Sequence, residues 1–209
     1  MSYRSEVIVA SDVELLTIIL GKRATAEALL KRAGSLFTLL FETRDESGQL
    51  VCAQGSSPYP ANAIRKLHAA CELAARAIAE DLKGRDCLTS PRAVRDLLRL
   101  KLAGLEHEVF MCLQLDAQHR VIAIEELFRG TLTQTSVYPR EVVKAALRAN
   151  AAAVIFAHNH PSGVAEPSHA DEILTRSLKS ALALVDVQVL DHFIVAGPRV
   201  LSFAERGLL

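Results

Sequence analysis

The segment AHNHPSGVAEPSHAD, residues 157–171, gathers side chains that bind metal ions within a short polar stretch. His158 and His160 are two residues apart, and Asp171 follows in what reads as the next helix. Residues i and i+2 of a β-strand project to the same face, so a strand that continues through His160 presents both imidazoles together. Two imidazoles and one carboxylate, with water as fourth ligand, are typical of a catalytic zinc site. The spacing therefore predicts one Zn²⁺ per chain, held by His158, His160 and Asp171.

A hydrolytic zinc site also needs a general base, normally a carboxylate that does not itself bind the metal. Zinc lowers the pKa of bound water and polarises a carbonyl, which suits hydrolysis. We expect Glu108 to be the base, because it is the first residue of the apolar segment EVFMCLQL. A charged side chain at the start of a buried strand is unusual unless it has a function. Glu125 and Glu126 are alternatives, since they lie in RVIAIEELF, a strand that could be its neighbour.

The same residues also have a simpler structural interpretation. Ser168 and Asp171 have Ser-x-x-Asp spacing, close to the Ser-x-x-Glu of a capping box, and could serve only to begin a helix. Pro161, Gly163 and Pro167 could serve only to make a turn. However, two histidines on one face after a buried strand are hard to explain as core. The set as a whole favours a metal site.

Other kinds of site find less support in the sequence. HEVFM begins like the zinc-binding HExxH helix, but Met111 stands in place of the second histidine. The chain has no PCxxC of a zinc deaminase, no P-loop and no GxGxxG. His192, in VLDHFIVAG, either lines the site from a nearby strand or is a buried, hydrogen-bonded histidine. The other histidines are expected at the surface or on helices: His68, His107, His119 and His169.

The second part of the chain has the pattern of an α/β unit around this site. AAVIFA is an apolar run typical of a buried strand, and it leads directly into the two histidines. SHADEILTRSLKSALALV has helical periodicity, so Asp171 would return in its first turn. Further helices are expected for TSPRAVRDLLRLKLAG and YPREVVKAALRANA, and further strands for EVFMCLQL, RVIAIEELF, VQVLDHFIVA and RVLSF.

The first part of the chain is predicted to be a small bundle of three to four helices. Ser11 and Glu14 have capping-box spacing at VELLTIIL, and ATAEALLKRA stops at Gly34. After a polar loop, ANAIRKLHAACELAARAIAEDLKG has the pattern of a long helix. The change from an all-α to an α/β pattern predicts two domains, residues 1–88 and 89–209.

The composition limits the classes of protein and partner. Lys plus Arg and Asp plus Glu each total 24 in 209 residues, so the net charge gives no sign of a tail that binds nucleic acid or membranes. The start of the chain lacks the pattern of a signal peptide, and no apolar run is long enough to span a membrane. Four widely spaced cysteines fit buried thiols in a reducing cytosol, so we expect a cytoplasmic protein without membrane partners.

HNHPSGVAEPSHAD resembles the JAMM (MPN+) metalloprotease motif, a His-x-His-Pro followed by Ser-x-x-Asp. The longer segment from LFRGTLTQTSVYPREVV to LDHFIVAG is similar to the RadC-like branch of that superfamily. The resemblance implies a JAMM/MPN-type domain, a mixed β-sheet flanked by helices, that binds Zn²⁺ through His158, His160 and Asp171. It further implies that Glu108 is the base and that Ser168 helps to stabilise the oxyanion.

The helical part resembles the N-terminal domain of the RadC family, which often carries a helix-hairpin-helix element that binds DNA. The glycine hairpin of that element is replaced here by GSSPYPANAI, with Pro58 and Pro60 where glycines are expected. Glycine lets backbone amides approach a phosphate, whereas proline has no N–H to offer. We therefore expect a degenerate element and only weak DNA binding.

The ligand set and the resemblance together lead us to expect a zinc-dependent hydrolase of JAMM type. The resemblance implies that its substrate is a peptide or protein in which it cleaves peptide or isopeptide bonds. Water activated by the metal and deprotonated by Glu108 would attack the carbonyl, and Glu108 would pass the proton to the leaving amine. Two alternatives stay open. One is a DNA repair or recombination factor with a mainly structural zinc, and the other is a metal-bearing interaction module without a substrate of its own.

Overall fold

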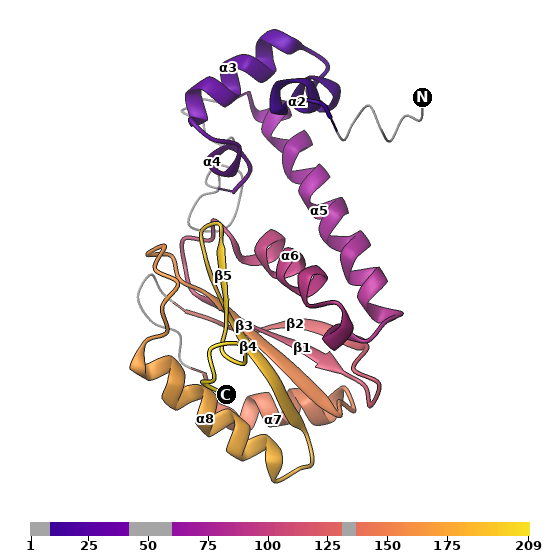
Figure 1. Ribbon diagram of the computed structural model, residues 1–209, viewed down its shortest axis with the longest axis vertical. Helices are drawn as coiled ribbons and strands as arrows, with labels where there is room; N and C mark the ends of the chain where they lie inside the picture. The colour runs from indigo at the N-terminus through magenta and orange to yellow at the C-terminus, as the bar shows by residue number, and fades with distance from the viewer. Residues whose placement is uncertain (1–8, 42–59, 131–136) are drawn as a thin grey trace. The chain divides into compact units, whose positions relative to one another are not determined.

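The computed structural model describes residues 9–41, 60–130 and 137–209 (Figure 1). The chain divides into two compact units, Met1–Ala74 and Ala75–Leu209. The division falls inside a long helix, α5 (Ala61–Lys83), whereas the pattern change in the sequence comes near residue 88. Pro58, in the segment expected to replace the glycine hairpin, lies outside the described residues. Among the helices that are described, none is long and apolar enough to cross a membrane.

The first unit is helical, as its sequence pattern predicts. Ser11 and Glu14 form a complete capping box, in which each side chain accepts a hydrogen bond from the other residue's backbone N–H. Gly21 and Gly34 end two helices in the left-handed conformation that glycine adopts at little cost. The helices are α2 (Asp12–Leu20), α3 (Arg23–Ala33), α4 (Leu36–Phe41) and the first part of α5. Their apolar faces share a core that includes Leu16, Leu29, Leu39, Ile64 and Leu67.

The second unit is built on a five-stranded mixed sheet with the strand order β2-β1-β3-β4-β5. The strands are β1 (Val109–Leu115), β2 (Val121–Arg129), β3 (Ala153–Asn159), β4 (Gln188–Ala196) and β5 (Arg199–Ser202). β3 and β4 are parallel, and the other neighbouring pairs are antiparallel. Every residue of β3 is buried, as its uninterrupted apolar run predicts for a central strand.

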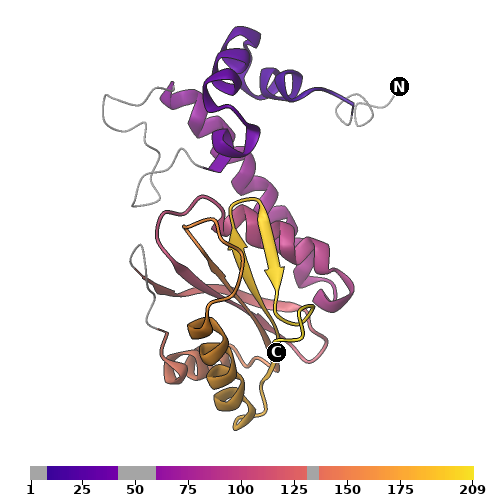
Figure 2. The same cartoon turned by 60° about the vertical axis from the view of Figure 1, so that its left-hand side comes forward.

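Helices cover both faces of this sheet (Figures 1 and 2). α7 (Pro139–Arg148) and α8 (His169–Ala183) lie on one face, and α6 (Pro91–Leu102), preceded by a short 3-10 turn at Cys87–Thr89, lies on the other. The core on the α7 and α8 side contains Phe110, Val154, Phe156, Val142 and Leu178. Helices before the sheet and on both its faces confirm the predicted α/β fold class.

The connection from β3 to β4 positions the candidate site. Parallel neighbouring strands need a crossover, and α8 supplies it, so this helix begins near the carboxyl end of β3. Alternate residues of β3 face opposite sides of the sheet, and Val154 and Phe156 face α8. His158, two residues further, shares that face and therefore points toward the start of α8.

Candidate metal centre

The two histidines of the quoted segment meet at the end of β3. His158 is the penultimate residue of the strand, and the backbone N–H of His160 still donates to the Val195 carbonyl of β4, at 2.9 Å. The strand pairing therefore extends to His160, and both imidazoles lie on one side. Their Nε2 atoms are 2.9 Å apart.

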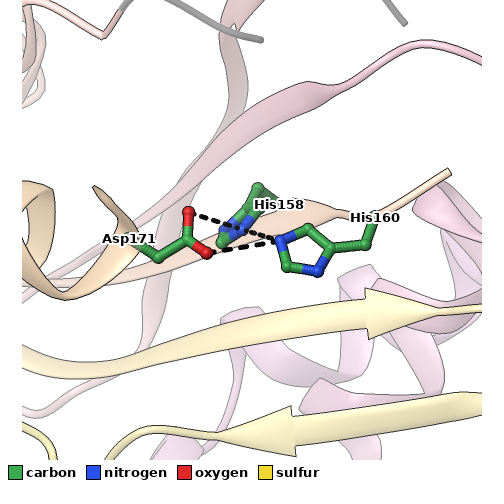
Figure 3. A group of neighbouring side chains, drawn as sticks. All are labelled: His158, His160 and Asp171. Atoms are coloured by element: carbon green, nitrogen blue, oxygen red, sulfur yellow. Dashed lines mark hydrogen bonds and ion pairs between the residues drawn. The ribbon is translucent and has the colours of Figure 1, made fainter. Parts of the chain in front are cut away.

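Asp171 reaches the same point from the first turn of α8. Ser168 is the N-cap of this helix, and its N–H and hydroxyl donate to Asp171 Oδ2 at 2.7 and 2.6 Å. The carboxylate also faces the rings: Oδ1 is 3.3 Å from His158 Nε2, and Oδ2 is 3.4 Å from His160 Nε2 (Figure 3). The two interpretations of the Ser168–Asp171 spacing are thus compatible, because one carboxylate caps the helix and contacts both histidines.

The spacing of the His158, His160 and Asp171 side chains suits a small, tetrahedrally coordinated cation. Zinc bonds of about 2.0–2.2 Å at tetrahedral angles place ligand atoms about 3.3 Å apart. Here the two Nε2 atoms are 2.9 Å apart, His158 Nε2 is 3.3 Å from Asp171 Oδ1, and His160 Nε2 is 3.4 Å from the second carboxylate oxygen, Oδ2. In the part of the chain that the structure describes, His158, His160 and Asp171 are the one group of three or more His, Cys, Asp or Glu side chains close enough to share an ion. The donor set therefore fits the zinc that the spacing predicts.

The charges at the site reinforce one another. Burial raises the pKa of Asp171, but the hydrogen bonds with His158 and His160 outweigh burial and hold that pKa well below its usual range. Burial lowers the pKa of His160, but the hydrogen bonds with Asp171 and the Val164 carbonyl, together with the charges of Asp171 and Glu108, give a net upward shift. The site therefore holds an ionised carboxylate at neutral pH and favours positive charge beside it.

Asn159, between the two histidines, faces the opposite side of the sheet, as strand alternation predicts. Its side chain is 2% exposed and holds the segment that leads into β1. Its Oδ1 accepts a hydrogen bond from the Val109 N–H at 2.8 Å, and its Nδ2 donates to the carbonyls of His107 and Leu105 at 2.9 and 3.2 Å. Glu108 lies between two of these anchored residues, so Asn159 fixes the backbone on both sides of the expected base.

Of the three candidate bases, Glu108 lies closest to the histidines along the sheet. It immediately precedes β1, whose second residue is opposite His158, and its charge raises the pKa of His160. Glu125 and Glu126 lie on β2, opposite positions further along β1. Each of these two is paired with an arginine, at 3.0 and 2.8 Å. The geometry therefore favours Glu108 over its two alternatives.

The loop between His160 and α8 is held at several points. His160 Nδ1 donates to the Val164 carbonyl at 2.7 Å, which orients the ring. Gly163 has a φ of 75°, a left-handed conformation that favours glycine, and its N–H donates to the His160 carbonyl at 3.0 Å. Arg199 of β5 donates to the Gly163 carbonyl at 2.9 Å. The turn residues noted in the sequence thus give this loop a defined shape beside the site.

His192 is fully buried on β4 and hydrogen-bonded, with its Nε2 2.9 Å from His158 Nδ1. Its other ring nitrogen is 2.7 Å from the hydroxyl of Thr175, a residue that sequence reasoning did not single out.

The expectation that His107 lies at the surface or on a helix was wrong. That side chain is only 8% exposed, and neither ring nitrogen has a hydrogen-bond partner among the described residues. Its position just before a buried strand was the signal that pointed to burial.

Two of the three described cysteines agree with the prediction of buried thiols. Cys87 and Cys112 are buried and Cys71 is half-buried, and all three are free thiols. Burial raises the pKa of Cys87 to about 11, and burial also raises the pKa of Cys112 above its usual range. Cys52 lies outside the described residues. The thiols of Cys87 and Cys112 therefore stay protonated at neutral pH and are poor nucleophiles.

The mixed sheet, whose β3–α8 connection brings His-x-His together with a helix-capping aspartate, agrees with the JAMM/MPN-type domain that the motif resemblance implies. Residues 88–208 match the family described as RadC-like JAB domain. The chain belongs to this family, as the resemblance of its motifs indicated.

Three curated relatives extend the similarity, and all are named UPF0758 protein. The one from Nitrosomonas eutropha is 57% identical over 208 residues, which cover 96% of this chain and 90% of the relative. The one from Dechloromonas aromatica is 60% identical over 207 residues, with 95% and 89% covered. The one from Thiobacillus denitrificans is 67% identical over 143 residues, with 68% and 64% covered. The similarity to the first two therefore includes the helical first unit.

Proposed function

We propose that this protein is a zinc-dependent hydrolase of JAMM type that cleaves peptide or isopeptide bonds in a peptide or protein substrate. The observation that carries the proposal is the meeting of three side chains, His158, His160 and Asp171, with 2.9 Å between the two Nε2 atoms and 3.3 and 3.4 Å from these to the two carboxylate oxygens. Membership of the RadC-like JAB family supports it, since the JAB superfamily contains metallohydrolases and typically binds zinc.

When bound, Zn²⁺ would lower the pKa of a water molecule and polarise the substrate carbonyl. His158 and His160 would bind through Nε2 and Asp171 through its carboxylate. Glu108 would accept the proton of the attacking water and then deliver it to the leaving amine, so that the amide bond breaks as the amine becomes neutral. Asn159 would keep Glu108 at a constant distance from the histidines throughout these two proton transfers.

Ser168 would have to change its hydrogen-bond partner to take the role proposed for it. Its hydroxyl donates to Asp171 Oδ2 at 2.6 Å, so it would have to turn away from Asp171 to donate to the developing oxyanion. The carboxylate would keep the Ser168 backbone N–H as a donor, at 2.7 Å. The substitution Ser168→Ala should therefore leave metal binding largely intact and lower the turnover rate.

The first experiment is the zinc content of the purified full chain, wild type beside His160→Ala, by elemental mass spectrometry. We expect about one zinc per wild-type chain, because three ligands with one open position bind a single ion, and loss of the metal in the variant. A well-folded wild-type protein that contains no metal and takes up no added zinc would refute the proposal.

The second experiment tests the base. Glu108→Gln should keep the zinc and lose turnover of a peptide library by at least about 100-fold, the usual contribution of a general base. Glu126→Gln is the matched control, because its carboxylate is paired with Arg129 on β2 and should not affect turnover. Unchanged turnover in Glu108→Gln would assign the base to another residue. Full zinc occupancy without any hydrolysis in the wild type would favour a metal-bearing interaction module.

A further inference from the structure

A chain of hydrogen bonds runs through the core from the backbone of α8 to the ring of His158. The hydroxyl of Thr175 is 2.6 Å from the carbonyl oxygen of Asp171, one turn earlier in the helix. The same hydroxyl is 2.7 Å from His192 Nδ1, and His192 Nε2 is 2.9 Å from His158 Nδ1. Thr175 and His192 are 1% and 0% exposed, so water does not compete for these contacts.

The donor and the acceptor of each of these three hydrogen bonds follow from the number of protons available. A carbonyl oxygen only accepts, so the single hydroxyl proton of Thr175 is donated to Asp171. The Thr175 oxygen must then accept, which places a proton on His192 Nδ1. A neutral imidazole has only one N–H, so His192 Nε2 accepts and His158 Nδ1 donates.

The surroundings of His192 favour the neutral ring that this count assumes. Phe203 stacks on the imidazole with ring centroids 4.8 Å apart and an interplanar angle of 25°. Phe110 and Phe156 approach it edge-on, at 5.6 and 6.0 Å. Burying an imidazolium among aromatic rings would be costly, and the same rings hold the imidazole in one orientation.

We propose that Thr175 and His192 are positioning residues that hold the proton of His158 on Nδ1 and so leave Nε2, which faces Asp171 Oδ1 and His160 Nε2, as its metal-binding nitrogen. This inference rests on the proposed function, in which Nε2 of His158 binds zinc. His160 reaches the same tautomer by a shorter route, because its Nδ1 donates directly to the Val164 carbonyl. Both histidines then use Nδ1 for these hydrogen bonds and turn Nε2 toward the site, so neither ring has to change its orientation when the metal arrives.

Without this relay, His158 would have a competing tautomer. A proton on Nε2 would donate to Asp171 Oδ1, 3.3 Å away, and would have to be displaced before a metal could bind. The hydrogen bond from His158 Nδ1 to the unprotonated Nε2 of His192 disfavours that tautomer. The relay also explains why a threonine, rather than an aliphatic residue, occupies a buried position on the apolar face of α8.

The test is the tautomer of His158 in the metal-free full chain, read from the ring ¹⁵N chemical shifts, together with zinc affinity from a competition titration. Thr175→Val keeps the side-chain shape but removes the hydroxyl. We expect this variant to populate the Nε2–H tautomer of His158 and to bind zinc about 10- to 100-fold more weakly, the usual effect of losing an outer partner of a ligand histidine. Thr175→Ser should restore the wild-type tautomer and affinity.

Thr17→Val is the matched control, because the Thr17 hydroxyl makes the same local bond to a carbonyl four residues earlier, at 2.6 Å, but on α2 of the first unit and not on α8. It should change neither the tautomer nor the affinity. Should Thr175→Val fail to fold, His192→Phe tests the same relay from the other strand. A wild-type tautomer and wild-type affinity in a folded Thr175→Val would overturn the inference. A wild-type protein that binds no zinc would instead overturn the proposed function, whatever the tautomers are.

Discussion

Asn159→Ala should separate the position of Glu108 from the binding of metal. The substitution removes an amide side chain that makes three hydrogen bonds, at 2.8, 2.9 and 3.2 Å, to the backbone around Glu108. It leaves the backbone of β3 and both histidines in place. We therefore expect the anchor of Glu108 to be lost while the three proposed metal ligands stay together.

The magnitude follows from those three bonds. A buried hydrogen bond contributes about 1 kcal/mol net, so their loss should lower the free energy of unfolding by about 3 kcal/mol. The true value should not be smaller, because the Val109 N–H is buried and an unpaired buried donor costs about 1–3 kcal/mol by itself. The two compact units need not unfold together, so a single denaturation curve would mix their transitions.

Native-state hydrogen exchange avoids that difficulty, because it reports the free energy of opening at each amide. In Asn159→Ala, the amide of Val109 should lose its protection from exchange. The amide of Leu113, within β1, should lose only as much protection as follows from the lower stability of the whole unit. Zinc uptake should persist and turnover should fall. Asn62→Ala, which removes an exposed amide at the start of α5, is the control. Persistent protection at Val109, with an unfolding free energy within about 0.5 kcal/mol of wild type, would refute this reasoning.

Three further predictions concern the helix cap, the thiols and DNA. Asp171→Asn should lower the stability of the metal-free protein by about 1 kcal/mol through its cap and abolish tight zinc binding. Glu14→Gln, in the other capping box, should leave zinc binding unchanged in the same titration. Cys87 and Cys112 should react with iodoacetamide more slowly than Cys71 at pH 8, as peptide mass spectrometry would show, because burial raises their pKa values. Since the unfolded chain loses these thiol protons above about pH 8.5 while the folded chain keeps them, urea melts should show stability falling as the pH rises further. Binding to branched or single-stranded DNA should be weak, and an affinity that falls steeply with salt in fluorescence anisotropy would contradict that expectation.

The parts of the site that local sequence patterns predict are those that depend on neighbours along the chain. The buried run AAVIFA predicts a central strand, and its period of two predicts that His158 and His160 share a face. The Ser-x-x-Asp spacing predicts the cap of α8. Asp171 is expected near the end of β3 because it lies in the first turn of the helix that follows, whereas the parallel pairing of β3 with β4 is known only from the structure.

Only the tertiary structure decided which distant residues support those three. Whether His192 contacts His158 depends on the parallel register that sets it opposite Phe156. The hydroxyl of Thr175 meets His192 only because α8 packs on that face of the sheet. Asn159 anchors the residues around Glu108 across 50 to 54 positions of sequence. Periodicity reports which face a side chain occupies, but a hydrogen bond needs a register and a distance, and these are set when separate elements pack together.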